Sequence, residues 1–91
     1  MDLLSEEEII TQLDTVAWER DGSSIVRTVI REDFRDAMLY VGAVAYLAES
    51  SGHHPDILIQ WNRVTLTLST HSAGGLTWND FVLAHKIDTL S

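Results

Sequence analysis

Three of the four histidines in the chain stand where they could share a proton-transfer site. His53 and His54 are adjacent, and His71 follows the next predicted hairpin. Imidazole titrates at about pH 6.5, so it can give or take a proton at neutral pH. Two imidazoles around one pocket would suit a reaction that removes one proton and adds another. No serine, threonine or cysteine stands in a recognised nucleophile motif, which favours proton transfer over hydrolysis by a triad.

A predicted β-hairpin brings these histidines together. Residues 57–61 read as a strand, and residues 64–69 alternate between apolar and polar side chains. Asn62-Arg63 is the predicted two-residue turn, because asparagine tolerates a positive φ. Pairing across that turn sets His54 opposite His71, and side chains directly opposite have Cβ atoms roughly 4.5–5.5 Å apart. We therefore expect these two imidazoles at the open end of the sheet.

Two carboxylates are expected beside the imidazoles. Glu49 lies four residues before His53, at the C-terminal end of a predicted helix. Asp80 is the acidic member of a predicted capping box that opens the last helix, and it could also face the pocket. Either carboxylate could orient an imidazole and raise its pKa.

Other interpretations of the same residues stay open. Histidines near glycine and proline are often plain solvated loop residues, and three histidines with a glutamate are common zinc ligands. Against a metal, neighbours in an extended chain point in opposite directions, so His53 and His54 cannot easily share one ion. We expect His85, alone in the last helix, to be structural or solvated, and Trp18 and Trp78 to be core or surface aromatics.

Three helices are predicted around the strands. The run Ser5-Glu6-Glu7-Glu8 forms a capping box, so the first helix covers about residues 5–13. The second covers about residues 32–50 and stops at Gly52. The third covers about residues 77–87. The predicted buried stripe of the second helix consists of Phe34, Met38, Val41, Ala45 and Ala48. Ala37, Val44 and Leu47 widen this stripe.

Two hairpins complete the predicted fold. Asp21-Gly22 separates β-prone residues 16–20 and 25–30, which is a hairpin signal. Trp61 ends the third strand and is expected to be partly buried, and residues 71–75 are a predicted loop. The order α-β-β-α-β-β-α predicts one α+β domain over residues 1–91, with about four antiparallel strands in one sheet and three helices on one face.

Composition narrows the function classes. Fourteen acidic against six basic residues give a net charge of −8, which repels phosphate backbones and disfavours nucleic-acid binding. No apolar run approaches the ~20 residues that span a bilayer, and the N-terminus lacks the basic region of a secretion signal, so a cytoplasmic location is expected. The absence of cysteine excludes disulfides and thiolate chemistry. A chain of 91 residues has a thin core, which favours self-association.

The histidine pattern resembles the signature of the pterin-4a-carbinolamine dehydratase family. The resemblance is carried by Glu49, His53-His54-Pro55, Trp61, His71 and Asp80. The runs Leu68-Ser69-Thr70-His71 and Ala73-Gly74-Gly75-Leu76 also look like the family. One position departs from the pattern. Some family members have an acidic residue just before the histidine pair, and this chain has Gly52 there, which bears on how the substrate amino group is held.

The resemblance implies a reaction. Family members dehydrate 4a-hydroxytetrahydropterin to quinonoid dihydropterin, which recycles the tetrahydrobiopterin that aromatic amino acid hydroxylases consume. It implies that His54 and His71 are the general acid and base, and that His53 holds the pterin and assists. Retention of all three histidines favours catalysis.

The resemblance also implies supporting roles around the histidines. Glu49 and Asp80 would support the imidazoles, backbone groups of Ser69-Thr70 would hydrogen-bond the pterin ring, and Trp61 would belong to the supporting or substrate-binding set. No metal and no organic cofactor is expected, because the pterin is the substrate.

Two hypotheses of different classes follow. The first is a hydro-lyase acting on a pterin, in the same pathway as an aromatic amino acid hydroxylase. The alternative is a non-catalytic oligomeric scaffold or coactivator-type binding module with an unused pterin pocket. A homodimer or homotetramer through the helices is expected, and neither the physiological pterin nor the first histidine to move a proton follows from the sequence.

Overall fold

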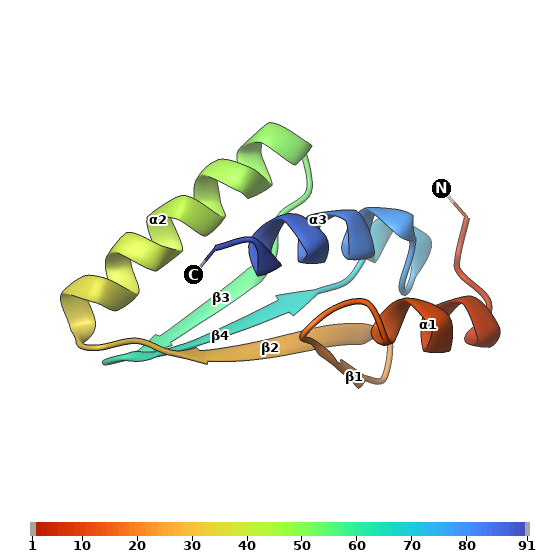
Figure 1. Cartoon of the computed structure of the whole chain (residues 1–91). Helices are drawn as coiled ribbons and strands as arrows, with labels where there is room; N and C mark the ends of the chain where they lie inside the picture. The colour runs from red at the N-terminus through yellow and green to blue at the C-terminus, as the bar shows by residue number, and fades with distance from the viewer. Residues whose placement is uncertain (1, 91) are drawn as a thin grey trace.

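The fold is one sheet with helices on one side, as the computed structural model of residues 2–90 shows (Figure 1). In chain order the elements are α1 (Glu6–Leu13), β1 (Glu19–Asp21), β2 (Ser24–Ile30), α2 (Phe34–Ser51), β3 (Asp56–Gln60), β4 (Arg63–Leu68), the 3₁₀ turn η1 (His71–Ala73) and α3 (Trp78–Asp88). The sheet is antiparallel with strand order β1-β2-β4-β3. The predicted fold class and element order are confirmed, and η1 occupies the predicted loop.

The core lies between the sheet and the helices above it. The predicted alternation in β4 is confirmed, because Val64, Leu66 and Leu68 are fully buried while Thr65 and Thr67 lie on the other face. In Figure 1, α2 and α3 cover one face of the sheet and α1 lies near the end formed by β1. Within residues 2–90 no helix is long and apolar enough to cross a membrane.

Each hairpin turn is displaced by one residue from its predicted position. Asp21 pairs with Ser24, so Gly22 is the first turn residue, with φ 59°. Gln60 pairs with Arg63, so the second turn is Trp61-Asn62 and the predicted Asn62-Arg63 turn is wrong.

Asn62 explains the position of the second turn. Its side-chain amide donates to the Arg31 carbonyl at 3.0 Å, and its own carbonyl accepts from the Arg31 N–H at 2.8 Å. These two bonds to the chain after β2 hold Asn62 inside the turn. Trp61 then takes a left-handed conformation, with φ 53°, and its side chain is 63% exposed rather than partly buried as predicted.

Helix α2 turns to the core a face that only partly matches the predicted one. Its buried residues are Ala37, Tyr40, Val44 and Ala48. Ala48 and the two widening residues Ala37 and Val44 were predicted, whereas Phe34, Met38 and Ala45 of the predicted stripe are exposed. The helix carries two apolar stripes, so periodicity alone could not select the one that meets the sheet.

The helices begin at capping residues, of which the box at α1 was predicted and the cap at α2 was not. Ser5 Oγ accepts from the Glu8 N–H at 3.2 Å, and Glu8 Oε1 accepts from the Ser5 N–H at 2.9 Å. Asp33 caps α2 by accepting the Asp36 N–H at 2.8 Å. Each pairing satisfies donors that the first helical turn leaves without a partner.

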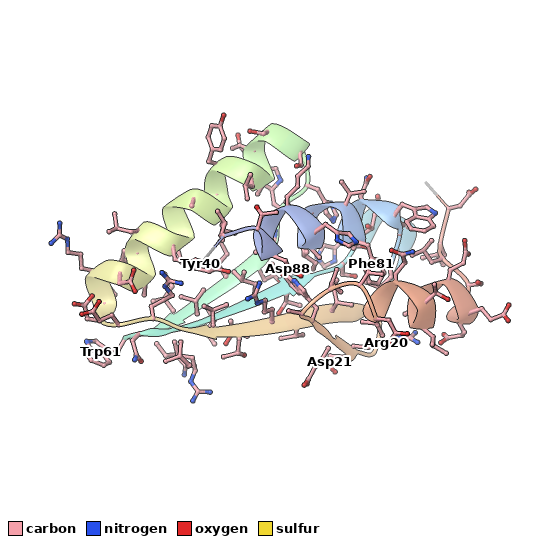
Figure 2. The ribbon with its side chains drawn as sticks, viewed as in Figure 1. Arg20, Asp21, Tyr40, Trp61, Phe81 and Asp88 are labelled. Atoms are coloured by element: carbon pink, nitrogen blue, oxygen red, sulfur yellow. The ribbon has the colours of Figure 1, made fainter. Side chains whose placement is uncertain are left out.

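Asp88 fastens the end of α3 to the sheet. Its carboxylate accepts from Trp18 Nε1 at 2.7 Å, from Arg27 Nη1 at 2.6 Å and from the Ala17 N–H at 2.8 Å. Trp18 is thereby a buried core residue, and Figure 2 shows Asp88 beneath the last turn of α3. The contact fixes the height of α3 above β2.

Val64 tests the facing of β4. Val64→Asp places an unpaired charge among fully buried side chains, so we expect the free energy of unfolding to fall by roughly 3–5 kcal/mol, measured by urea titration. Thr65→Asp, on the opposite face, is the control and should cost less than about 1 kcal/mol. An equal loss in both variants would contradict this facing.

Candidate acid–base site

The end of α2 delivers two histidines to the site. Gly52 ends the helix in the left-handed conformation, with φ 64° and ψ 24°, and its N–H bonds back to the carbonyls of Ala48 and Glu49. The His53 N–H also bonds to the Ala48 carbonyl, at 3.2 Å. This C-terminal cap turns the chain sharply, so that the residue pair after Gly52 leaves the helix and approaches β4.

The register of the second hairpin changes the partners of these histidines. Asp56 pairs with Thr67, and continuing that antiparallel ladder sets His54 opposite Ser69 and His53 opposite Thr70. The predicted pairing of His54 with His71 is therefore wrong. Moving the turn by one residue shifts the register by two, which keeps every side chain on its predicted face.

All three predicted histidines nevertheless surround one hollow. Its volume is about 290 Å³, and its walls are Gly52, His53, His54, Ser69, Thr70, His71 and Ser72. It opens at the end of the sheet where α2 stops and β3 begins. The three imidazoles therefore gather at this end of the sheet, although the ladder itself does not extend to His71.

His53 is the histidine most tightly held. Its Nε2 lies 2.6 Å from Asp80 Oδ1, and its side chain is only 14% exposed. Asp80 is fully buried and its Oδ2 accepts from the Thr77 N–H at 2.9 Å, so it caps α3 and faces His53 at once. The predicted capping role of Asp80 is therefore confirmed, and its other oxygen contacts His53 from behind the hollow, which Asp80 itself does not line.

His54 and Glu49 form a second, exposed pair. His54 Nε2 is hydrogen-bonded to Glu49 Oε2, and the two side chains are 61% and 78% exposed. An ion pair in water at this exposure contributes little to stability. The pair can therefore rearrange around a ligand at little cost, unlike the buried pair behind it.

His71 begins η1 and is exposed. Among residues 2–90, no hydrogen bond or ion pair engages its imidazole. The short loop that carries it is fixed by its backbone, because Thr70 accepts from the Ala73 and Gly74 N–H groups at 3.0 Å and donates to the Gly75 carbonyl at 2.9 Å. A loop closed by its own backbone bonds thus presents an imidazole for which the described residues supply no partner.

Ser69 and Thr70 form the polar edge beside the histidines. The N–H and carbonyl of Thr70 take part in hydrogen bonds inside the loop. The Thr70 hydroxyl points the other way, donating to Asp80 Oδ2 at 2.8 Å. Ser69 uses its own hydroxyl to bond the Ser23 carbonyl at 2.8 Å, which ties the edge to the first hairpin.

Trp61 and His85 lie away from the site. Trp61 sits in the β3–β4 turn, at the opposite end of the sheet (Figure 2). Six residues, five of them in β3, lie between it and His54, and they span roughly 20 Å at about 3.3 Å per residue. His85, on α3, is exposed and its Nε2 lies 3.1 Å from Thr15 Oγ1, in keeping with the prediction of a structural or solvated residue.

The histidine hollow differs both from a metal site and from a second hollow of the chain. Within residues 2–90, no three histidine, aspartate or glutamate side chains converge as metal ligands would. A separate hollow of about 320 Å³ is lined by Glu7, Glu8, Thr11, Gln12 and Trp78. No group in its walls is of a type that ordinarily titrates near neutral pH, which distinguishes it from the histidine hollow.

Comparisons with known proteins show which family the sequence resembles. The family model described as Pterin 4 alpha carbinolamine dehydratase matches residues 2–90. A protein of Nocardia farcinica (strain IFM 10152) is 55% identical over 91 residues, covering 99% of this chain and 96% of its own length. One of Roseiflexus castenholzii (strain DSM 13941 / HLO8) is 51% identical over 89 residues, covering 97% and 96%. Both names give pterin-4-alpha-carbinolamine dehydratase as a provisional assignment.

Two solved structures share the fold. The crystal structure of a transcriptional coactivator/pterin dehydratase from Brucella Melitensis has a TM-score of 0.90 and 32% identity, covering 96% of each chain. A pterin dehydratase-like protein identified as a RuBisCO assembly factor in the alpha-carboxysome has a TM-score of 0.65 and 20% identity, covering 82% of this chain and 87% of its own. The second likeness concerns the fold alone.

The backbone conformation at position 52 explains why a glycine stands there. A Cβ added at Gly52 would meet no heavy atom within 4 Å, so only its positive φ opposes substitution. We expect Gly52→Ala to lower the free energy of unfolding by about 1 kcal/mol. Gly52→Asn should cost less, because asparagine tolerates this conformation, and thermal unfolding of both variants measures the order. A larger loss for Gly52→Asn would contradict the capping role.

Proposed function

Because the chain belongs to the pterin-4-alpha-carbinolamine dehydratase family, we propose that it is a hydro-lyase that dehydrates 4a-hydroxytetrahydropterin to quinonoid dihydropterin. The observation that carries the proposal is the hollow walled by His53, His54 and His71. The reaction would return a pterin that an aromatic amino acid hydroxylase had used.

The chemistry needs one proton donor and one proton acceptor. The bond between carbon 4a and the hydroxyl oxygen breaks, and the oxygen takes a proton and leaves as water. A carbon–nitrogen double bond forms to the adjacent ring nitrogen, which loses its proton. One proton is added and one is removed, so imidazoles that titrate near neutral pH suit both steps. The balanced reaction calls for no metal and no organic cofactor.

We assign the acid and the base to His54 and His71. The side chain of His54 is well exposed and that of His71 has no partner among the described residues, which leaves both able to meet a substrate. His53 is assigned to hold the pterin and assist, because the buried Asp80 restrains its ring. Glu49, which is hydrogen-bonded to His54, is assigned to support that imidazole.

The dimensions of the hollow suit a small heterocycle. Its volume of about 290 Å³ is near the lower end of ligand pockets, roughly 300 Å³. Because the Thr70 backbone is used within its loop, we assign the polar edge that meets the pterin ring to Ser69. The position of Trp61 at the other end of the sheet leaves it outside this set within one chain.

An oligomer through α2 is the second part of the proposal. The outer face of α2 exposes four large apolar or aromatic side chains, which are Phe34, Met38, Leu39 and Tyr46. Exposed apolar side chains gathered on one element in this way favour an interaction surface. A homodimer or homotetramer would cover it, which supports the expectation of helix-mediated assembly.

The same surface supports the non-catalytic alternative. A scaffold or coactivator-type module would use the α2 face to hold a partner and leave the histidine hollow idle. The similar protein from Brucella Melitensis is described as a transcriptional coactivator as well as a pterin dehydratase. That description is consistent with a binding function for this chain. The two functions differ in one property, since only the enzyme binds and converts a pterin at the histidines.

Replacing either assigned acid–base residue should abolish most activity. We expect His54→Ala and His71→Ala each to lower kcat for dehydration of freshly prepared 4a-hydroxytetrahydropterin by about 10²–10³-fold. Both variants should keep the far-UV spectrum and melting temperature of the wild type, because neither side chain is buried. His85→Ala is the matched control and should leave kcat unchanged. Full activity in both variants would refute these assignments.

The α2 face can be tested by solution mass. Leu39→Glu puts a charge on that face at a residue that is 66% exposed, so we expect the oligomer to dissociate, as measured by light scattering after gel filtration. Ile10→Glu, at an equally exposed apolar residue of α1, is the control and should leave the mass unchanged. A wild-type monomer, or an Ile10→Glu variant that dissociates equally, would contradict assembly through α2.

A further inference from the structure

The polar residues buried in this protein are concentrated behind one histidine. Apart from tyrosine, the buried polar or charged residues in the described part of the chain are Thr70, Thr77 and Asp80. They form one cluster, and the cluster ends at His53. Burying a carboxylate without partners is costly, so each bond that it accepts is needed to keep it there.

The acceptors in the cluster determine where its protons lie. An ionised carboxylate only accepts, so the bond of 2.6 Å between Asp80 Oδ1 and His53 places a proton on Nε2 of the imidazole. The Thr70 hydroxyl has one proton and gives it to Asp80 Oδ2 at 2.8 Å. The Thr77 hydroxyl, 2.8 Å from Thr70 Oγ1, must therefore be the donor in that pair.

The result is a directed chain of hydrogen bonds. It runs from the Thr77 hydroxyl to the Thr70 hydroxyl, and from there to Oδ2 of Asp80. The same oxygen accepts the Thr77 N–H, at 2.9 Å. With Oδ2 held by two donors from two segments, the carboxylate cannot rotate, and Oδ1 remains turned toward His53. A neutral His53 is then left with Nδ1 as its unprotonated nitrogen.

Helix capping alone does not account for this arrangement. A cap at α3 needs only the bond from the Thr77 N–H to Asp80. The Thr70 hydroxyl comes from the segment after β4, and Thr70 also lines the histidine hollow. The cluster therefore couples the start of α3, the end of β4 and the imidazole of His53.

We propose that Thr77 and the side chain of Thr70 are positioning residues that lock His53, through Asp80, in the tautomer with its proton on Nε2. This inference rests on the proposed function for its catalytic consequence, since a fixed Nδ1 lone pair would be the atom of His53 that accepts a hydrogen bond from the pterin. The lock itself is a property of the folded chain and exists whether or not a pterin is turned over.

Nitrogen-15 NMR of the imidazoles tests the lock without any substrate. At alkaline pH, where imidazole is neutral, wild-type His53 should show a protonated Nε2 and an unprotonated Nδ1. Thr70→Val removes the hydroxyl but keeps the shape, so both nitrogens of His53 should move toward the averaged shifts of a mixed tautomer. Thr70→Ser should restore the wild-type spectrum.

Two further variants complete the test, one as a second break in the chain of hydrogen bonds and one as a control. Thr77→Val breaks the chain at its far end and should cause a smaller shift in the same direction, which keeps the test usable if Thr70→Val does not fold. Thr65→Val, on the outer face of β4, is the matched control and should leave His53 unchanged. Wild-type His53 with its proton on Nδ1 would overturn the proposal. Folded Thr70→Val and Thr77→Val variants that both keep the wild-type tautomer would overturn it as well.

Steady-state kinetics then separate positioning from packing. Thr70→Val should lower kcat roughly tenfold, the scale of one hydrogen bond, with KM changed less than about threefold and with rescue by Thr70→Ser. A loss of activity that only follows the unfolded fraction would overturn the catalytic part. A tautomer shift in a protein whose wild type has no dehydratase activity would instead refute the proposed function and leave the lock intact.

Discussion

A carboxylate held out of water is the constraint on which the site depends. Asp80 is fully buried at the start of α3, where it accepts hydrogen bonds from the helix, from Thr70 after β4 and from His53 after α2. Removing any of these donors would leave a buried charge short of a partner, and that penalty exceeds the net value of the bond itself. The end of α2, the end of β4 and the start of α3 are therefore tied to one point.

The histidines differ because their carboxylates differ. Asp80 and His53 are buried and share a rigid network, whereas Glu49 and His54 meet in water and can separate easily. His71 stands on a loop that its own backbone holds, with no carboxylate beside it among the described residues. One hollow thus combines a fixed imidazole with two accessible ones, a division of labour that suits holding a ring while protons move on and off it.

Local chemistry predicted most of the fold and tertiary contacts decided the rest. The capping residues Ser5 and Gly52 and the alternation from Val64 to Leu68 are local signals, and the elements they predicted are present. The turn after β3 was misplaced because Asn62 is held by Arg31, a contact between distant segments. That error did not move any side chain to the other face of the sheet, because a two-residue register shift leaves every side chain on its face.

The remaining errors have the same origin. The exposed apolar stripe of α2 satisfies helical periodicity as well as the buried one does. Which stripe meets the sheet is therefore decided by tertiary packing, which the spacing of apolar residues does not reveal. The role of the Thr77 hydroxyl was hidden because a threonine at the start of a helix is explained by capping alone. Its contact with Thr70 becomes visible only when α3 is placed against the end of β4.

The most direct test of the proposed function is the loss of freshly prepared 4a-hydroxytetrahydropterin in the presence of the wild-type protein, followed by absorbance and compared with the spontaneous reaction. We predict a rate proportional to protein concentration and well above the spontaneous rate near neutral pH. A well-folded protein that leaves the spontaneous rate unchanged would contradict the assignment of the histidine hollow as a dehydratase site, and would favour the scaffold that the exposed face of α2 supports.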